Sequence, residues 1–314
     1  MSGQERYRPR FTEIATFMRL PAIHDPAEAD IVLAGIPFDL GVTNRPGPRH
    51  GPRQVRDYSS FMRATHHVSH ITPGKLCRIG DLGDAPIDLF SIERSVEGIT
   101  GFYRAIHDAG AAPISVGGDH LTTLPVLRGI AHDRPVGLVH FDSHCDTGGP
   151  YMGTTLHHGA TFKLAVEEGL LDPKRTIQIG IRGSLNDEHQ WRFSYESGMR
   201  VVGIEEVFEK GVDAVIAEAR RVAGDGPTYI SFDVDGLDPA YAPGTGTPEA
   251  GGFSMFQAQR MVRGLRGLNL IGADVVEVSP PFDPSGYTAL NAATIMFEIL
   301  CILSEAVARR RSTN

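Results

Sequence analysis

Short apolar runs alternate along the chain with longer stretches in which apolar residues recur at helical spacing. Residues 29–36 are almost continuously apolar, as expected of a strand buried on both faces of a sheet. In residues 92–109, by contrast, Val96, Ile99 and Ile106 fall on one helical face. Elements of these two kinds continue to the end of the chain, with further strands predicted at 77–80, 113–117, 136–142, 176–182, 200–204, 228–234 and 270–278, and helices at 54–64, 121–131, 161–171, 211–223, 254–267 and 288–310.

This alternation predicts the fold class. Strands that each lead into a helix are typical of an α/β protein with a mainly parallel sheet and helices on both faces. The chain contains no internal repeat, low-complexity tract or linker, so we expect one domain over residues 29–314. Residues 1–28 are polar and irregular apart from an apolar patch at 15–20. They are expected to form an N-terminal arm, which is either a surface extension or a cover for the site or a neighbouring subunit.

Charge and cysteine content narrow the class of protein. The net charge is −8, and Arg309–Arg311 is the first run of basic residues, so a nucleic-acid partner is not expected. The three cysteines, Cys77, Cys145 and Cys301, have no metal or redox spacing, which is typical of reduced thiols in the cytoplasm. No signal peptide is recognisable, and the apolar stretch 295–308 is too short to span a membrane.

Potential metal ligands follow the predicted strand at 136–142. Asp142, His144 and Asp146 are spaced two apart, so they project to one side if the strand stays extended. A mixture of carboxylate and imidazole ligands suits manganese, nickel, zinc or iron. The alternative is a polar strand end whose aspartates cap the next helix.

Two other strand ends carry similar residues. His120 follows the strand at 113–117, while Asp233 and Asp235 end the strand at 228–234. Carboxyl ends of strands form the sites of open α/β sheets, so we predict one site with two metals. Asp142 and Asp233 would each bridge both ions. His120 and Asp146 would complete the ligand set of one ion, and His144 and Asp235 that of the other. Two such ions would activate water as hydroxide to attack an electrophilic carbon, and four carboxylates among six ligands favour manganese or nickel.

Glu277 and the histidine pair His157–His158 suggest what is attacked. Glu277 ends the strand at 270–278, where its carboxylate could hold a guanidinium group by charge-assisted hydrogen bonds, or could be a surface or capping residue. A histidine in the loop after the metal strand could pass a proton to a leaving amine, or be structural.

These motifs resemble those of the ureohydrolase (arginase and agmatinase) family. Gly117–His120, Asp142–Asp146 and Ser231–Asp235 match its three signatures, and the likeness is greatest to the guanidinopropionases and guanidinobutyrases of the agmatinase-like branch. The resemblance implies a three-layer α/β/α arginase-like fold, a trimer or hexamer, and hydrolysis of a guanidino group to urea and an amine. It also implies two manganese ions on six ligands: His120, Asp142, His144, Asp146, Asp233 and Asp235.

The resemblance further assigns roles in catalysis. His158 would be the proton shuttle and Glu277 the guanidinium anchor, with Asp146 also among the catalytic residues. Further substrate contacts are expected from His157, Arg182 and Tyr151.

The substrate is left open among several guanidino compounds. Guanidinopropionate, guanidinobutyrate or agmatine is expected. Ser143 stands where the family usually has Ala, and Cys145 stands where it often has Ser, Thr or Ala. These departures keep open a nickel-dependent hydrolase of guanidine, an alkylated guanidine or a biguanide such as metformin, which could need a paralogous partner subunit. The rival classes are a non-catalytic subunit and a one-metal zinc deacetylase, and the complete carboxylate set argues against both.

Overall fold

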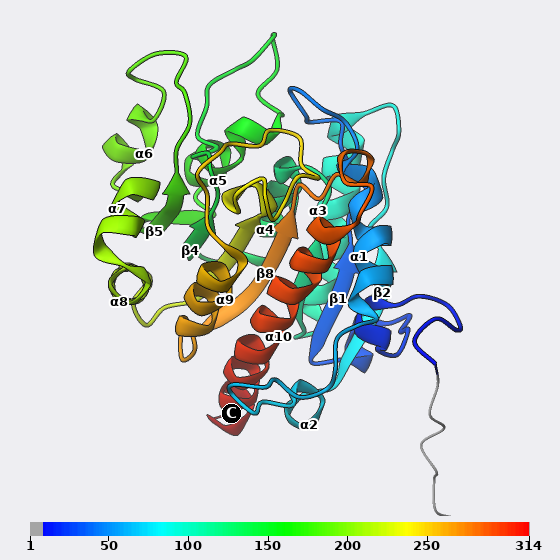
Figure 1. Cartoon of the computed structure of the whole chain (residues 1–314). Coiled ribbons are helices and arrows are strands. Elements are labelled where there is room, and N and C mark those ends of the chain that lie inside the picture. The colour runs from blue at the N-terminus through cyan, green and yellow to red at the C-terminus, as the bar shows by residue number, and fades with distance from the viewer. Residues whose placement is uncertain (1–8, 314) are drawn as a thin grey trace, which may run out of the picture.

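The computed structural model describes residues 9–313, which form a twisted sheet between two layers of helices (Figure 1). The eight strands are all parallel and lie in the order β2-β1-β3-β8-β7-β4-β5-β6. Their bounds are β1 Ile31–Gly35, β2 Ile79–Asp84, β3 Ala112–Val116, β4 Val136–Phe141, β5 Leu171–Ile181, β6 Arg200–Gly203, β7 Thr228–Asp233 and β8 Leu270–Val276. The expected α/β/α fold is confirmed, and the sheet is wholly rather than mainly parallel.

Each face of the sheet is covered by its own helices. Helices α3, α4 and α5 pack on one face, and α1, α8, α9 and α10 pack on the other. In β1, Ile31 and Leu33 point to one apolar core while Val32 and Ala34 point to the other. The helices are α1 Gly51–Ser59, α2 Pro73–Leu76, α3 Ile92–Asp108, α4 Thr123–Ile130, α5 Thr161–Glu167, α6 Arg192–Ser197, α7 Ile204–Lys210, α8 Val212–Ala223, α9 Met255–Gly264 and α10 Tyr287–Thr313.

Some helices depart from the sequence prediction. Helix α1 begins at Gly51, three residues before the predicted helix at 54–64, because Pro52 is tolerated in the first turn, where its missing N–H is not needed. The short helices α2, α6 and α7 were not predicted. Each is too short to show a periodic apolar face.

Helix α10 is the long apolar element of the core. It extends beyond the apolar stretch at 295–308, and its segment Tyr287–Ser312 is long and apolar enough to cross a bilayer, with a mean hydropathy of 1.6. In this fold 72% of the apolar window is buried, and the helix packs against β8, α1 and α9. Apolar residues lie on most sides of the helix because most of it is covered.

The described part of the N-terminal arm lies along the edge strand β2. Phe17 is fully buried, and its N–H donates to Asp81 Oδ2 at 2.8 Å. The Asp81 N–H in turn donates to the carbonyl of Pro21 at 2.9 Å. This stretch therefore shields the sheet edge. The first eight residues of the predicted arm lie outside the described residues.

Candidate metal centre and active site

Four neighbouring strands bring the predicted site residues to one edge of the sheet. The order β3-β8-β7-β4 places their carboxyl ends side by side, although they are far apart in the sequence. The residues at those ends are His120 after β3, Glu277 after β8, Asp233 and Asp235 at the end of β7, and Asp142, His144 and Asp146 after β4.

A first cluster surrounds the imidazole of His120. Its Nδ1 lies 3.1 Å from Asp142 Oδ2, 3.0 Å from Asp146 Oδ2 and 3.1 Å from Asp233 Oδ2. The imidazole is fully buried, and none of these contacts among the described residues has the geometry of a hydrogen bond to Nδ1. A nitrogen lone pair facing three carboxylate oxygens fits a cation in their midst better than a hydrogen bond.

A second cluster shares Asp142 with the first. His144 Nδ1 lies 3.4 Å from Asp142 Oδ1 and 3.2 Å from Asp235 Oδ2. Asp142 therefore offers one oxygen to each cluster, as expected of a bridging carboxylate. Asp233 differs, because its Oδ2 faces His120 but neither of its oxygens contacts His144 in the part of the chain that the structure describes.

The strand does not stay extended through these residues, so strand alternation is not what brings their side chains together. Strand β4 ends at Phe141, before the first ligand, and Asp146 has a left-handed φ of 50°. Asp142 Oδ1 accepts the His144 N–H at 2.6 Å, which makes a tight turn. Asp142 and Asp233 thus each bend the chain that follows them, since a short carboxylate readily accepts an N–H group two residues ahead.

His140 is a part of the centre that the sequence analysis missed. Gln178 Nε2 donates to His140 Nδ1 at 3.1 Å, so the proton of a neutral imidazole lies on Nε2 and is donated to Asp142 Oδ2 at 2.7 Å. A polar residue two positions before Asp142, in an otherwise apolar strand, was the available signal. His140 orients the bridging carboxylate.

A buried hydrogen-bond chain fixes the ring of His120. Its Nε2 donates to Ser231 Oγ at 2.8 Å, and Ser231 Oγ donates to Asp274 Oδ1 at 2.6 Å. The other carboxylate oxygen of Asp274 accepts the hydroxyls of Tyr229 at 2.9 Å and Thr123 at 2.8 Å. The proton is thereby held on Nε2, which leaves the Nδ1 lone pair directed at the carboxylates.

The electrostatics of both clusters suit divalent cations. Burial alone would lower the pKa of His120, but Asp142, Asp146 and Asp233 raise it well above its ordinary value. The pKa of His144 is raised in the same way, against burial, chiefly by Asp235. Asp233 has a pKa well above the usual range because of burial and its carboxylate neighbours. Without metal, protons collect where the negative charge is concentrated, and a pair of divalent ions would replace them.

Glu277 and His158 meet beside the first cluster. Glu277 Oε1 accepts the backbone N–H of His120 and the Nδ1–H of His158, both at 2.9 Å. Its Oε2 is buried and has no hydrogen-bond partner among the residues that the structure describes. Burial would lower the pKa of His158, but the charge of Glu277 raises it to about 9.

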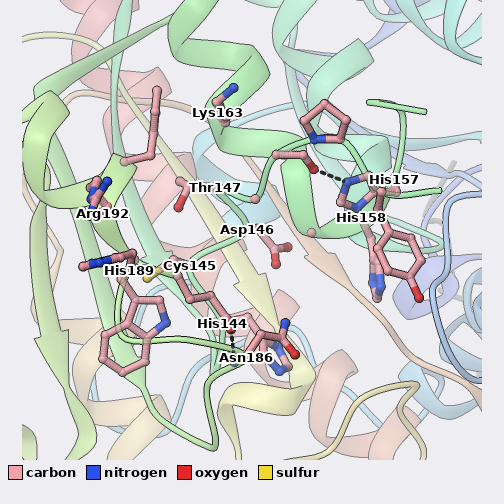
Figure 2. A pocket seen from close by; sticks show the side chains of 18 of the residues that line it. His144, Cys145, Asp146, Thr147, His157, His158, Lys163, Asn186, His189 and Arg192 are labelled. Atoms are coloured by element: carbon pink, nitrogen blue, oxygen red, sulfur yellow. Dashed lines mark hydrogen bonds between the residues drawn. The ribbon is translucent and has the colours of Figure 1, made fainter. Parts of the chain in front are cut away.

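A cavity of about 870 Å³ opens beside these residues (Figure 2). Figure 2 shows His157 and His158 on the side of the cavity away from His189 and Arg192. Tyr151 and His157, which were expected to contact substrate, line the cavity together with His144, Asp146, Lys163 and Asn186.

Arg182 is placed differently from the prediction. Its guanidinium group donates to backbone carbonyls of Gly180, Asp235, Gly236, Leu237, Glu249 and Ala250. The side chain is buried and does not line this cavity, so it has no donor left for a substrate carboxylate. Its contacts instead hold the turn that carries Asp235.

The two residues that depart from the family pattern have different surroundings. Cys145 is buried beside Ile181, Val201 and Trp191, and burial raises the pKa of its thiol to about 12. It therefore packs as a neutral thiol, and thiolate ligation is not expected. Ser143 contacts a candidate ligand, since its hydroxyl donates to Asp235 Oδ1.

Comparison with known proteins places this geometry in context. The model of the arginase family matches residues 29–301. The chain is 60% identical to a guanidinopropionase of Pseudomonas aeruginosa, over 96% of this chain and 95% of that protein. It is 44% identical to a guanidinobutyrase of the same organism, over 96% of both proteins. The solved structure of proclavaminate amidino hydrolase from Streptomyces clavuligerus superposes with a TM-score of 0.92 at 35% identity, covering 95% of this chain and 100% of that one.

Proposed function

Because this chain belongs to the arginase family and is a ureohydrolase of that family, we propose that it hydrolyses a guanidino acid to urea and an amino acid. The observation that carries the proposal is the position of Glu277. Its buried Oε2 has no hydrogen-bond partner among the described residues, and its Oε1 accepts the N–H of His120, in the first of two His/Asp clusters that share Asp142. A guanidinium group is planar and cationic, so one buried carboxylate oxygen can hold its N–H groups while its carbon faces the clusters.

The proposal includes two divalent ions at the clusters. His120, Asp142, Asp146 and Asp233 would hold one ion, and Asp142, His144 and Asp235 the other, with Asp233 also able to share its second oxygen after a small rotation. Such ions supply Lewis acidity and make hydroxide available from water near neutral pH. Manganese is proposed because four of the six ligands are hard carboxylates, and nickel is the metal to compare with it.

Glu277 would bind the guanidinium group, and His158 would donate a proton to the departing amine. Glu277 Oε2 accepts from the guanidinium, which also orients the carbon for attack. The same carboxylate holds His158 protonated through Oε1, so His158 carries a proton that the departing amine needs. The carboxylate of Glu277 would thus bind the substrate through one oxygen and hold the general acid His158 through the other.

Guanidinopropionate is the substrate that we propose first. The guanidinopropionase relative supports this choice, and the cavity wall contains groups suited to a carboxylate tail, including Lys163 and Tyr151. The wall also carries Asp187 and Glu196, which would suit the second cation of agmatine, so agmatine is the compound to test against it.

Assembly and location form part of the same proposal. A homo-oligomer, trimeric or hexameric, is proposed from the family resemblance, with a paralogous partner chain as the alternative. Location in the cytoplasm is supported by three free, buried cysteines. Light scattering of the purified chain, alone and after coexpression with any paralogue, tests the assembly.

The test is urea release from metal-free enzyme reloaded with manganese or, separately, nickel. The panel holds guanidinopropionate, guanidinobutyrate, agmatine, arginine, guanidine and dimethylbiguanide. We expect manganese-dependent turnover that is fastest with guanidinopropionate and absent from the Asp142→Ala variant. Turnover of agmatine alone, or of the biguanide alone with nickel, would contradict the guanidino-acid proposal.

A further inference from the structure

The hydroxyl of Ser143 lies between two candidate ligands of the second cluster. Ser143 is fully buried, and its Oγ is 2.7 Å from Asp235 Oδ1 and 3.1 Å from His144 Nδ1. The backbone N–H of Ser143 points at the same oxygen of Asp235, at 3.1 Å. Ser143 therefore makes two hydrogen bonds to one carboxylate oxygen.

Because of these bonds, the two carboxylate oxygens of Asp235 have different partners. Oδ1 accepts from Ser143 twice, while Oδ2 lies 3.2 Å from His144 Nδ1 and 3.3 Å from the hydroxyl of Thr247. Two donors on Oδ1 fix the rotation of the carboxylate about its side-chain bonds. Oδ2 is thereby directed at the place where His144 and Asp142 meet.

The hydroxyl has one proton, and its direction follows from the chemistry of its neighbours. When His144 Nδ1 binds a cation, its lone pair is used and it cannot accept the hydroxyl proton. Asp235 Oδ1 is then the only one of the two neighbours that can accept it, and the acceptor is charged, which makes the bond strong. When the ion is present, the hydroxyl of Ser143 therefore has one acceptor among these two groups, Asp235 Oδ1.

We propose that Ser143 is a positioning residue that fixes the orientation of Asp235 as a ligand of the ion held with His144. This rests on the proposed two-ion site and deepens it. The ion of His120 has no such dependence, because Ser143 makes no hydrogen bond to His120, Asp146 or Asp233 within the described residues. One serine hydroxyl therefore sets the affinity of one ion of the pair and not of the other.

The test measures metal binding directly. Metal-free enzyme is titrated with manganese, and free manganese is followed by its electron paramagnetic resonance signal to give two dissociation constants. The His144→Ala variant identifies which constant belongs to the second ion. In Ser143→Ala we expect that constant to weaken about tenfold, as for other groups that orient a ligand, while the first stays within twofold.

Two further variants separate positioning from general damage. Ser143→Thr keeps the hydroxyl and should restore most of the lost affinity. Ser95→Ala removes another buried serine, which lies on α3 and is hydrogen-bonded to the backbone of Asp88, and should leave both constants unchanged. A second constant in Ser143→Ala that stays within twofold of the wild-type value, or that tightens, overturns the proposal. So does equal weakening of both constants.

The outcome is distinguishable from that of the proposed function. If the wild-type protein binds two manganese ions but releases urea from no guanidino acid, the function fails and the role of Ser143 is still decided by the constants. If urea is released and Ser143→Ala binds both ions normally, the role of Ser143 fails alone.

Discussion

At the scale of single residues, the two carboxylate oxygens of Glu277 have different surroundings. Oε1 is fully occupied by His120 and His158, and Oε2 is buried without a described partner. The sequence could predict that a carboxylate stands at this strand end, because the strand pattern is clear. It could not predict the pairing with His158, because that contact joins residues 119 positions apart across two loops.

Removing only the charge of Glu277 tests its role. Glu277→Gln keeps the size of the side chain but replaces one oxygen by an amide. The loss of a charge-assisted hydrogen bond, worth about 1.5–3 kcal/mol, should lower kcat/KM about 10- to 100-fold. Manganese content should be unchanged, since Glu277 is not among the proposed ligands. Glu97→Gln on α3 is the exposed control, and loss of metal from Glu277→Gln would contradict the assignment.

His158 gives a pH dependence whose sign can be worked out. The folded-state pKa, about 9, lies above the ordinary value of 6.5, so the charged His158 stabilises the fold fully below pH 6.5. That contribution is lost as the pH rises through about 9, and amounts to about 3 kcal/mol at most. In thermal melts of metal-free protein, the excess Tm of wild type over His158→Gln should therefore shrink between pH 7 and 10. An excess that grows over that range would refute it.

At the scale of elements, the site depends on how strand ends turn. The order of strands and helices was predictable from apolar periodicity, and so was the gathering of the six candidate ligands at one sheet edge. The turns themselves were not, because Asp142 and Asp233 bend the chain by accepting N–H groups that an extended strand would direct elsewhere. Arg182 shows the same limit, since a cation near a strand end can serve a substrate or the backbone.

The carbonyl contacts of Arg182 should make it a stability residue. Arg182→Met leaves several buried carbonyls without donors, and each unsatisfied group costs about 1–3 kcal/mol. We expect the free energy of unfolding, measured by urea denaturation of metal-free protein, to fall by about 3 kcal/mol. The KM of the metal-loaded variant should change little. Arg104→Met on α3, which has one long contact to the carbonyl of Arg128, is the control. A large KM effect at unchanged stability would restore a substrate role.

A close approach near β3 gives a second test of element packing. A Cβ built on Gly118 would lie 1.5 Å from the carbonyl oxygen of Phe38, which is backbone and cannot yield easily. Gly118→Ala should therefore displace the turn that carries His120 and weaken manganese binding as well as stability. Gly101→Ala, where a Cβ meets nothing within 4 Å, should be tolerated. Equal behaviour of the two variants in manganese titration would contradict this.

At the scale of the whole molecule, folding and metal binding are linked. The described residues hold two clusters rich in carboxylates, which divalent cations would neutralise, so the metal-bound fold should be the more stable one. Free metal at 100 times its dissociation constant adds about 2.7 kcal/mol for each site. Chelation should lower Tm by several degrees, and Asp142→Ala should abolish that difference because both clusters share this carboxylate. A Tm that is indifferent to chelation would mean that neither cluster binds metal in the fold.

The position of β8 between β3 and β7 has a consequence for how the protein is made. On the ribosome, the residues of β3, β4 and β7 emerge first, but the strand that joins the two halves of the sheet comes only at Leu270–Val276. Until then the facing edges of β3 and β7 have no neighbour, and His120 stays apart from the other candidate ligands. Pairing between segments so distant in sequence is slow to form. Loading of the ion held with His120 should therefore be a late event that follows the addition of β8, and a nascent chain halted before residue 270 should not retain that ion.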